Sequence, residues 1–381
     1  MNGGSREIRE GYLDSSFIVS RGDRQMATLY LLSTSPNSGK TAVAVALGQR
    51  YQEQGRRVAW FKPISTTVVA EAGRLVDQDA QFVRAVLNLP QSVTELSSFA
   101  LTPETVREVV ETGEPLDGRD EIRRRFAAVA AEADLTLVEG GTTPVEGTLF
   151  GLDARSLVEM LDARVLVVAR WGSVFVADEI LWVRGMLGAR VAGVVLNAVP
   201  KSRETFAQGA FSQVLAARGV PVLAVIPEEK ILGAMSVREL AEVLGGTVLT
   251  AHEHLDELVE NLSVGAMSVD SALSYFRRKP NKAVITGGDR PDIQLAALET
   301  STKCMILTGN LQPSPVILGR AEEVGVPIVV VRHDTLTTVE IAEQYFGKIR
   351  FHQPQKLRRF IRLFEGRMDF SRLDAVLWGG Q

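Results

Sequence analysis

The sequence has little cysteine, no long apolar run and no leader-like apolar segment, and each absence excludes a class of protein. The single cysteine, Cys304, cannot form an internal disulfide and lies in an apolar run, so it reads as a small core residue in a reducing compartment. No stretch reaches the roughly 18 uninterrupted apolar residues of a membrane-spanning helix. The first 25 residues mix charges with short apolar pieces, which is unlike a signal peptide. We therefore expect a soluble cytoplasmic protein with no membrane partner.

An excess of positive charge is also lacking. The chain carries 42 basic and 46 acidic residues, which gives a formal net charge of −4. Proteins that bind the phosphate backbone of nucleic acids usually carry a basic excess, so nucleic acid is not an expected partner. A hydrophobic fraction of 45% over 381 residues is typical of a folded globular chain. That length predicts about two or three domains.

The chain shows the alternation of an α/β protein. From residue 27 onward, short β-branched runs alternate with longer amphipathic stretches, which is typical of βαβ units on a mostly parallel sheet flanked by helices. Strands are predicted at 28–32, 57–61, 135–138, 165–169, 191–196 and 222–226. A smaller α/β domain is predicted from strands at 261–264, 283–285, 304–307 and 327–331, with a capping box at Ser236 and Glu239 that starts a helix.

The domain organisation follows from these elements. We expect a flexible leader at 1–25, a first domain at 26–230, a second domain at 231–350 and a helical tail at 351–381. The tail places basic residues among apolar ones, which favours a short amphipathic helix with a solvated basic face. Docking of that helix to a membrane or a partner is the alternative.

A phosphate-binding loop is predicted directly after the first strand. Residues 33–41 read STSPNSGKT, and a helix rich in small residues follows. Backbone N–H groups at the helix start would hold phosphate oxygens, Lys40 would neutralise the terminal phosphates and the Thr41 hydroxyl would ligate Mg²⁺. The alternative is an ordinary helix start. The nucleotide-contacting residues expected here are Asn37, Ser38, Gly39, Lys40 and Thr41.

The loop departs from its motif at one position, and acidic residues elsewhere supply candidate metal ligands. Thr34 stands where the motif has glycine, so the entry to the loop must be made by a residue with a Cβ. Glu139 lies at the carboxyl end of a predicted buried strand, where open α/β sheets bind ligands. Asp77 and Asp79 could equally be solvated residues of a helix start. From the local sequence, Glu139 is the favoured metal ligand.

Taken together, these motifs resemble the dethiobiotin synthetase-like P-loop family. The resemblance rests on Gly39-Lys40-Thr41, Lys62-Pro63, Asp79-Ala80, Val138-Glu139-Gly140-Gly141, Val195-Leu196-Asn197 and Val225-Ile226-Pro227-Glu228. Within that family, the sequence looks most like the N-terminal module of long phosphotransacetylases. Residues 284–290, 306–309 and 334–338 resemble the DRTGG domain that follows the P-loop module in those proteins.

The resemblance implies a site for ATP and Mg²⁺. Lys40 and Thr41 would bind phosphate and metal, and Asp79 with Glu139 would complete the Mg²⁺ shell. By the same resemblance, the residues around adenine and ribose would be Asn197, Pro227 and Glu228.

The resemblance also bears on catalysis. Lys62 and Thr66 would face the substrate, as the matching positions do in dethiobiotin synthetases, where they assist attack on the γ-phosphate. Together with Lys40 they are the candidate catalytic residues. The synthetase sequence Gly-Ala-Gly-Gly after the metal acid is replaced here by residues 140–143, GGTT, so the substrate half differs from the family pattern while the nucleotide half is kept.

Three functions remain open at this stage. The first is an ATP-binding regulatory or sensor protein without acetyltransferase activity of its own. Its second domain would couple the nucleotide state to oligomerisation or to a partner enzyme of acetyl-CoA and acetyl-phosphate metabolism. The second is an ATP-dependent ligase that phosphorylates a carboxylate or carbamate. The third is a structural module that retains nucleotide to stabilise a homo-oligomer. A homodimer is expected from the family resemblance.

The second domain carries its own candidate site. The loop at 286–290 follows a strand, and a matching loop at 308–310 would lie on the same edge of the sheet. Two glycines in the first loop could form an anion-binding nest, which would suit a small acidic metabolite or a subunit contact. Ordinary turn chemistry between strand and helix is the alternative. Asp289 is the expected N-cap of the following helix.

Overall fold

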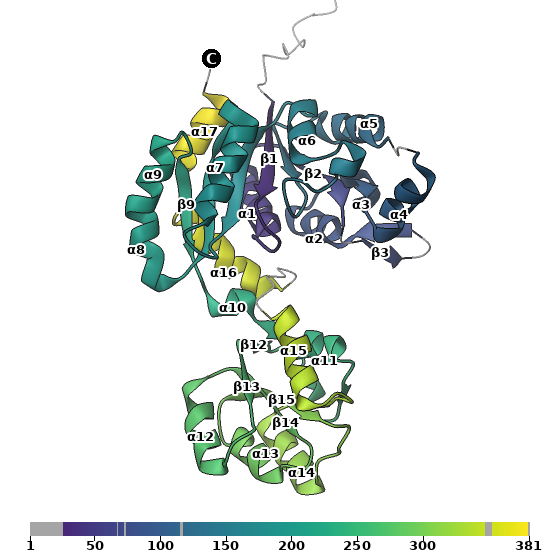
Figure 1. Cartoon of the computed structure of the whole chain (residues 1–381), viewed down its shortest axis with the longest axis vertical. Helices are drawn as coiled ribbons and strands as arrows, with labels where there is room; N and C mark the ends of the chain where they lie inside the picture. The colour runs from purple at the N-terminus through teal and green to yellow at the C-terminus, as the bar shows by residue number, and fades with distance from the viewer. Residues whose placement is uncertain (1–25, 67, 72–73, 115–116, 347–352, 380–381) are drawn as a thin grey trace, which may run out of the picture.

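The computed structural model of the chain describes residues 26–66, 68–71, 74–114, 117–346 and 353–379. They form two α/β domains that lie one above the other (Figure 1). The predicted α/β class is therefore confirmed. The predicted leader at 1–25 lies outside the described residues.

The first domain is built on a sheet of seven parallel strands in the order β5-β2-β6-β1-β7-β8-β9. All six strands predicted for it are present. The edge strand β5 was missed because its four residues, SSFA, carry no clear periodicity. The strand bounds are β1 Ala27–Ser33, β2 Val58–Ser65, β5 Ser97–Ala100, β6 Leu135–Glu139, β7 Arg164–Arg170, β8 Val191–Val199 and β9 Val222–Pro227.

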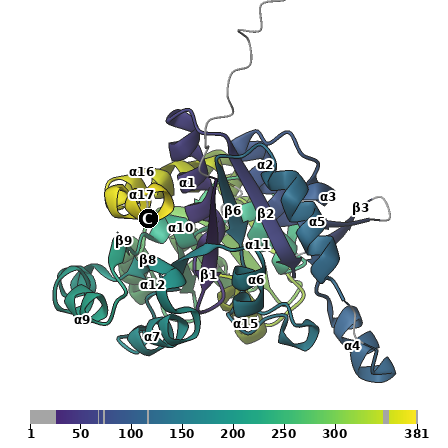
Figure 2. The same cartoon turned by 90° about the horizontal axis from the view of Figure 1, so that it is seen from above.

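Helices cover both faces of this sheet, which buries the central strands from both sides. Figure 2 shows α1 with α16 and α17 on one face, and α6 with α7 on the other. A short antiparallel hairpin, β3 (Val68–Glu71) and β4 (Arg74–Asp77), leads into α2. The helices are α1 Lys40–Glu53, α2 Gln78–Leu87, α3 Val93–Leu96, α4 Pro103–Thr112, α5 Arg119–Ala130, α6 Ala154–Met160, α7 Val176–Leu187, α8 Glu204–Phe206, α9 Ser212–Ala217 and α10 Lys230–Gly233.

The C-terminal tail forms two helices, α16 (Pro354–Glu365) and α17 (Phe370–Trp378), that return to the first domain. Phe360 and Phe364 are fully buried in its core. Tyr51 of α1 donates a hydrogen bond of 2.7 Å from its hydroxyl to Asp374 Oδ1, and its ring packs edge-on against Trp378. The tail is thus part of the first domain's core, so the second domain is an insertion between α10 and α16.

The second domain has a five-stranded sheet in the order β11-β16-β15-β14-β13, and its four predicted strands are all present. The short strand β11, which runs antiparallel to β16, was not predicted. The bounds are β11 Thr247–Val248, β13 Asn261–Val264, β14 Lys282–Gly287, β15 Thr302–Thr308 and β16 Ile328–Val330. A separate two-stranded pair is formed by β10 Met235–Ser236 and β12 Leu258–Val259.

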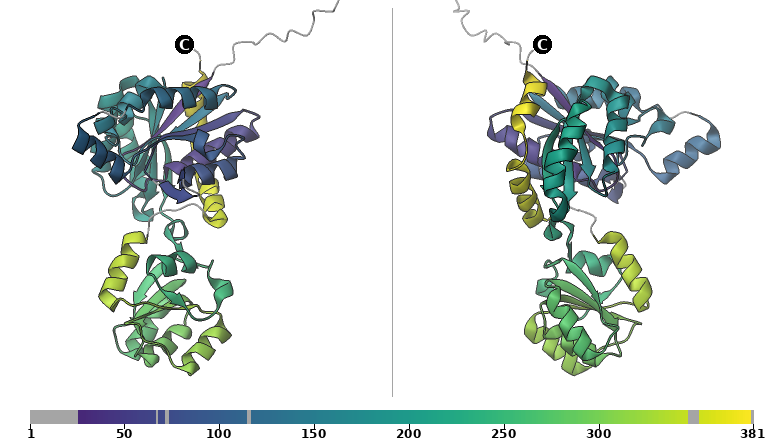
Figure 3. Two further views of the ribbon diagram at one scale, coloured as in Figure 1. Left: turned by 90° about the vertical axis from the view of Figure 1, so that its right-hand side faces the viewer. Right: turned by 60° about the vertical axis from the view of Figure 1, so that its left-hand side comes forward.

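Five helices pack on the two faces of this sheet and make two apolar clusters, one per face. Figure 3 shows α15 on the side of the sheet away from α12, α13 and α14. The predicted capping box at Ser236 and Glu239 is confirmed at the start of α11. No helix within the described ranges is both long and apolar enough to cross a membrane. The bounds are α11 Val237–Val243, α12 Val269–Arg278, α13 Pro291–Leu298, α14 Pro315–Val324 and α15 Thr335–Tyr345.

Candidate nucleotide-binding site

The predicted phosphate loop joins the end of β1 to the start of α1. Gly39 is the N-cap of α1 and has a φ of 95°, and no side chain caps the helix. The N–H groups of the first helical turn are therefore free of a side-chain cap and can donate hydrogen bonds to an anion bound at the helix start. Asn37 has a φ of 55°, whereas Thr34 is not among the described residues with positive φ. The loop entry thus uses backbone angles open to any residue, which explains why Thr34 can replace the motif glycine.

Asn197 holds the loop from the end of β8. Its Nδ2 donates a hydrogen bond of 2.7 Å to the carbonyl oxygen of Ser38, and its Oδ1 accepts one of 2.9 Å from the backbone N–H of Ala198. A Cβ at position 39 would lie 2.5 Å from Asn197 Nδ2. Ser33 donates a further bond of 2.7 Å to Ser38 Oγ. Gly39 is therefore required by the close approach of Asn197 as well as by its φ.

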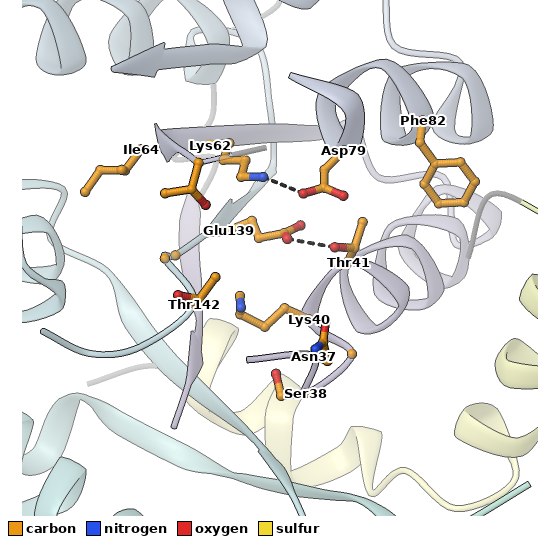
Figure 4. A pocket seen from close by; sticks show the side chains of 14 residues that line it. Asn37, Ser38, Lys40, Thr41, Lys62, Ile64, Asp79, Phe82, Glu139 and Thr142 are labelled. Carbon is orange, nitrogen blue, oxygen red and sulfur yellow. Dashed lines mark hydrogen bonds and ion pairs between the residues drawn. The ribbon is translucent and has the colours of Figure 1, made fainter. Parts of the chain in front are cut away.

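Thr41 and Glu139 meet at the mouth of the loop, as Figure 4 shows. Thr41 donates a hydrogen bond of 2.8 Å from Oγ1 to Glu139 Oε1. Glu139 is the last residue of β6 and is buried, and its Oε2 has no hydrogen-bond partner among the described residues. Burial and the nearby Asp79 raise the pKa of Glu139 to about 7. A buried carboxylate oxygen beside a threonine hydroxyl fits a divalent cation held mainly by phosphates.

Lys40 supplies the positive charge of the loop. Its side chain is buried, and burial lowers its pKa, while the neighbouring Glu139 acts in the opposite direction. An ammonium group in such a place gains most from a phosphate oxygen that replaces its lost hydration. Across the described ranges, no three or more His, Cys, Asp or Glu side chains are grouped to hold a metal by themselves. The Thr41 hydroxyl and the unpartnered Glu139 oxygen, with Lys40 beside them, fit a metal bound together with nucleotide phosphates.

Lys62 lies opposite the loop and is held by two aspartates. Its Nζ is 2.5 Å from Asp79 Oδ2 and 3.0 Å from Asp77 Oδ2. Burial lowers the pKa of Lys62, but the two aspartates outweigh this and raise it above its ordinary value. Asp77 is also the N-cap of α2, where its Oδ1 accepts a hydrogen bond of 2.7 Å from Ala80 N–H. Asp77 is thus a buried structural residue, which the local sequence had not separated from Asp79.

A cleft of about 140 Å³ brings most of the predicted residues together. It is lined by Asn37, Ser38, Gly39, Lys40, Thr41, Lys62, Thr66, Asp79 and Glu139. Ile64 and Phe82 also line it and were not named from the sequence, whereas residues 140–142 belong to the segment that departs from the family pattern. Gly140 lies close to Tyr30, because a Cβ at this position would be 2.5 Å from the Tyr30 ring.

The other three predicted nucleotide residues lie in a neighbouring pocket of about 170 Å³. Asn197, Pro227 and Glu228 line it, and Asn197 is the residue between this pocket and the phosphate loop. Arg170 and Phe346 also line this pocket and were not anticipated. The signal for Arg170 was present, because it directly follows the strand predicted at 165–169.

The two predicted loops of the second domain do lie side by side, since Gly287 of β14 pairs with Thr308 of β15. The prediction that Asp289 caps the next helix is wrong. Helix α13 begins at Pro291 with Arg290 at the N-cap position and no side-chain cap.

Residues 27–236 match the family described as an AAA domain, and residues 239–345 match the family described as a DRTGG domain. The chain belongs to this AAA family. It carries a DRTGG domain beside its P-loop domain, so the resemblance inferred from the sequence motifs is confirmed.

The chain is similar to known proteins over nearly its whole length. It is 26% identical over 370 residues to the phosphate acetyltransferase of Nitratidesulfovibrio vulgaris, which covers 92% of this chain and 51% of the relative. It is 29% identical over 229 residues to the ATP-dependent dethiobiotin synthetase of Rhodococcus erythropolis, which covers 58% of this chain and 97% of the relative. The chain thus spans about half the length of the phosphate acetyltransferases it matches.

A distant structural likeness involves the CBS and DRTGG domains of the regulatory region of Clostridium perfringens pyrophosphatase, solved with the activator diadenosine tetraphosphate. The TM-score is 0.27 at 16% sequence identity, and the match covers 41% of this chain and 74% of that chain.

Proposed function

We propose that the chain is an ATP-binding regulatory protein, in which the P-loop domain binds MgATP and the DRTGG domain conveys the bound state to an enzyme of acetyl-CoA and acetyl-phosphate metabolism. The observation that carries the proposal is the cluster of Lys40, Thr41 and Glu139 at the uncapped start of α1. Sequence similarity to phosphate acetyltransferases over 92% of the chain supports the metabolic assignment.

Each residue of the cluster has a role in this proposal. The α1 N–H groups and Lys40 bind the β- and γ-phosphates, while Thr41 and Glu139 hold Mg²⁺, with Asp79 as a further ligand. The metal neutralises phosphate charge when it is bound. Asn197 keeps the loop in the binding conformation through its bond to the Ser38 carbonyl.

The experiment is a calorimetric titration of MgATP into nucleotide-free protein, with ADP formation followed in the same samples. Wild type is compared with Lys40→Ala and with the control Lys201→Ala, which removes an exposed lysine. We expect binding that Lys40→Ala weakens at least tenfold, the order expected when a charged hydrogen bond is lost, and negligible turnover. Unchanged affinity in Lys40→Ala would remove the basis of the proposal.

The second candidate is an ATP-dependent ligase that phosphorylates a carboxylate or carbamate. It is favoured by one observation, namely that Lys62 and Thr66 line the same cleft as Lys40 and Thr41. Metabolite-dependent ADP formation that is lost in Lys62→Ala would establish this function in place of the first. The ion pairs of Lys62 with Asp77 and Asp79 favour the regulatory role, because they already engage the ammonium group.

The remaining assignments are part of the same proposal. We propose a cytoplasmic homodimer whose P-loop and DRTGG domains do not themselves transfer acetyl groups. The adjacent loops at 286–290 and 308–310 would bind a small acidic metabolite. Light scattering, an assay with acetyl-CoA and phosphate, and titration with small carboxylates test these three statements.

A further inference from the structure

The pocket that contains Asn197, Pro227 and Glu228 lies at the junction of the two domains, and we call it the junction pocket. The P-loop domain contributes the ends of β7, β8 and β9 and the short helix α10. The DRTGG domain contributes Glu260, directly before β13, and Phe346, directly after α15. Figure 1 shows α10 on the side of the first domain that faces the DRTGG domain, with α16 beside it. The walls of the junction pocket therefore depend on how the domains are placed.

Polar contacts hold the segments around the junction pocket. Glu229 forms two hydrogen bonds to Arg359 of α16, of 2.7 and 3.0 Å. Lys230 Nζ donates a hydrogen bond of 3.2 Å to Asn261 Oδ1 of the DRTGG domain. This last bond is exposed and spans the junction. A single exposed contact of this kind contributes little free energy to the relative placement of the two domains. A ligand that contacts both domains can therefore change that placement.

The junction pocket lies next to the phosphate cleft, and Asn197 lies between them. Asn197 lines the junction pocket, and its Nδ2 donates to the carbonyl oxygen of Ser38, which lines the cleft. A ligand whose phosphates lie on the α1 N-terminus can therefore extend past Asn197 into the junction pocket.

The chemistry of the lining favours a nucleoside over further phosphate. Three carboxylates, of Glu228, Glu229 and Glu260, line the junction pocket together with two cations, Arg170 and Lys230. The acidic excess disfavours phosphate, and carboxylates accept hydrogen bonds from hydroxyl and amino groups. Arg170 Nη1 is buried without a hydrogen-bond partner among the residues described, so it is a donor for a ring nitrogen or carbonyl oxygen. The aromatic ring of Phe346 offers an apolar surface to a base.

Glu260 is the acidic residue that belongs to the second domain. Its Oε1 accepts a hydrogen bond of 2.9 Å from Asn281 Nδ2, and its backbone N–H donates to the Asn281 carbonyl oxygen at 2.7 Å. These bonds fix the carboxylate to the DRTGG sheet. A ligand that contacts Glu260 thereby contacts the second domain.

The family resemblance already implies that the nucleoside lies beside Asn197, Pro227 and Glu228. We infer that Glu260 of the DRTGG domain recognises the hydroxyl or amino groups of that nucleoside. Nucleotide occupancy then fixes the DRTGG domain against the P-loop domain. This inference rests on the proposed function, because it needs the phosphates to occupy the α1 N-terminus. It adds the physical contact by which the bound state reaches the second domain.

The test compares two probes, MgATP and magnesium tripolyphosphate, which carries the phosphates without a nucleoside. Calorimetry is performed with wild type, Glu260→Ala and the control Glu299→Ala, which removes an exposed glutamate of the same domain. We expect Glu260→Ala to weaken MgATP binding about tenfold, as for one lost hydrogen bond to a charged group. Tripolyphosphate affinity should be equal in all three proteins. Equal MgATP affinity in Glu260→Ala and wild type would overturn the inference.

A second measurement uses the unaltered protein. Hydrogen exchange of residues 230–233 and 258–264 should slow with MgATP and remain unchanged with tripolyphosphate, although both probes protect the start of α1. Protection of α1 alone by MgATP would overturn the inference and leave the proposed function standing. Absence of Lys40-dependent MgATP binding would overturn both.

Discussion

Asn197 Nδ2 donates a hydrogen bond of 2.7 Å to the carbonyl oxygen of Ser38, which ties the end of β8 to the phosphate loop. The two residues are 159 positions apart, and the bond is buried. A buried amide that satisfies a loop carbonyl fixes the loop in one conformation before any ligand arrives. Asn197 therefore acts on phosphate binding through the backbone of its neighbour.

The substitution Asn197→Ala should weaken MgATP binding by about tenfold, because the Ser38 carbonyl loses its buried donor and the loop loosens. Binding of tripolyphosphate should fall by a similar factor, since the loop serves both ligands. Calorimetry checks this, with Gln344→Ala on the exposed side of α15 as the control. Tripolyphosphate affinity equal to that of wild type would contradict the role of Asn197 as a loop support.

The ion pairs of Lys62 predict different roles for its two aspartates. Asp77 is fully buried and caps α2, whereas the Asp79 side chain is 26% exposed beside the cleft. Asp77→Ala should lower the free energy of unfolding by about 3 kcal/mol, because it removes part of a buried charge pair and a helix cap. Asp79→Ala should lower the free energy of unfolding by less than about 1 kcal/mol, as expected for the loss of a partly exposed ion pair.

Urea denaturation of both variants measures this difference, and MgATP titration completes the comparison. Asp79→Ala should reduce the Mg²⁺ dependence of ATP binding, because Asp79 is a proposed metal ligand. Equal losses of stability in the two variants would contradict the assignment of Asp77 as the structural partner.

Much of this site could be predicted from the sequence, because its signals are local. The phosphate loop and the end of β6 each lie within one short run of residues, so Lys40, Thr41 and Glu139 could be named without a structure. The local sequence did not separate Asp77 from Asp79, since their difference in burial comes from how α2 packs, and only the family resemblance singled out Asp79. Arg170 and Glu260 belong to different domains, and no local pattern brings them to one pocket.

The position of the C-terminal tail could likewise not be predicted from the local sequence. The amphipathic pattern of α16 could be predicted from the sequence, but the pattern does not indicate which surface the apolar face of the helix covers. That surface belongs to the first domain, to which the chain comes back only after the whole DRTGG domain. In the folded chain α16 packs against α1, which is the helix that begins at the phosphate loop.

The buried position of Phe360 predicts that the tail stabilises the P-loop domain. Phe360→Ala should lower the free energy of unfolding by about 3–5 kcal/mol, as for other phenylalanines removed from a packed core. The control Phe175→Ala removes a side chain that is 72% exposed and should have little effect. Thermal and urea unfolding, followed by a spectroscopic signal from the P-loop domain, measure the difference in stability between the two variants. Similar small effects in both variants would contradict the place of α16 in the core.

Lys282 predicts a pH dependence of the DRTGG domain. It is fully buried at the start of β14, where its Nζ donates to Thr300 Oγ1 at 2.8 Å and to the Ser301 carbonyl oxygen at 3.0 Å, and burial lowers its pKa to about 8. In the unfolded chain the pKa returns to its ordinary value, so the unfolded state binds more protons between the two values. The destabilising effect of the buried charge is therefore complete below pH 8 and disappears as the pH rises toward that ordinary value.

The free energy of unfolding of the wild-type DRTGG domain should accordingly rise, relative to that of Lys282→Met, by about 2 kcal/mol between pH 7 and pH 10. Methionine keeps most of the apolar length of the side chain and removes the titrating group. Urea unfolding at several pH values, with Lys201→Met as an exposed control, measures this slope. A wild-type slope that matches the Lys282→Met slope would show that the ammonium group keeps its ordinary pKa inside the fold, and that its two hydrogen bonds offset the whole effect of burial.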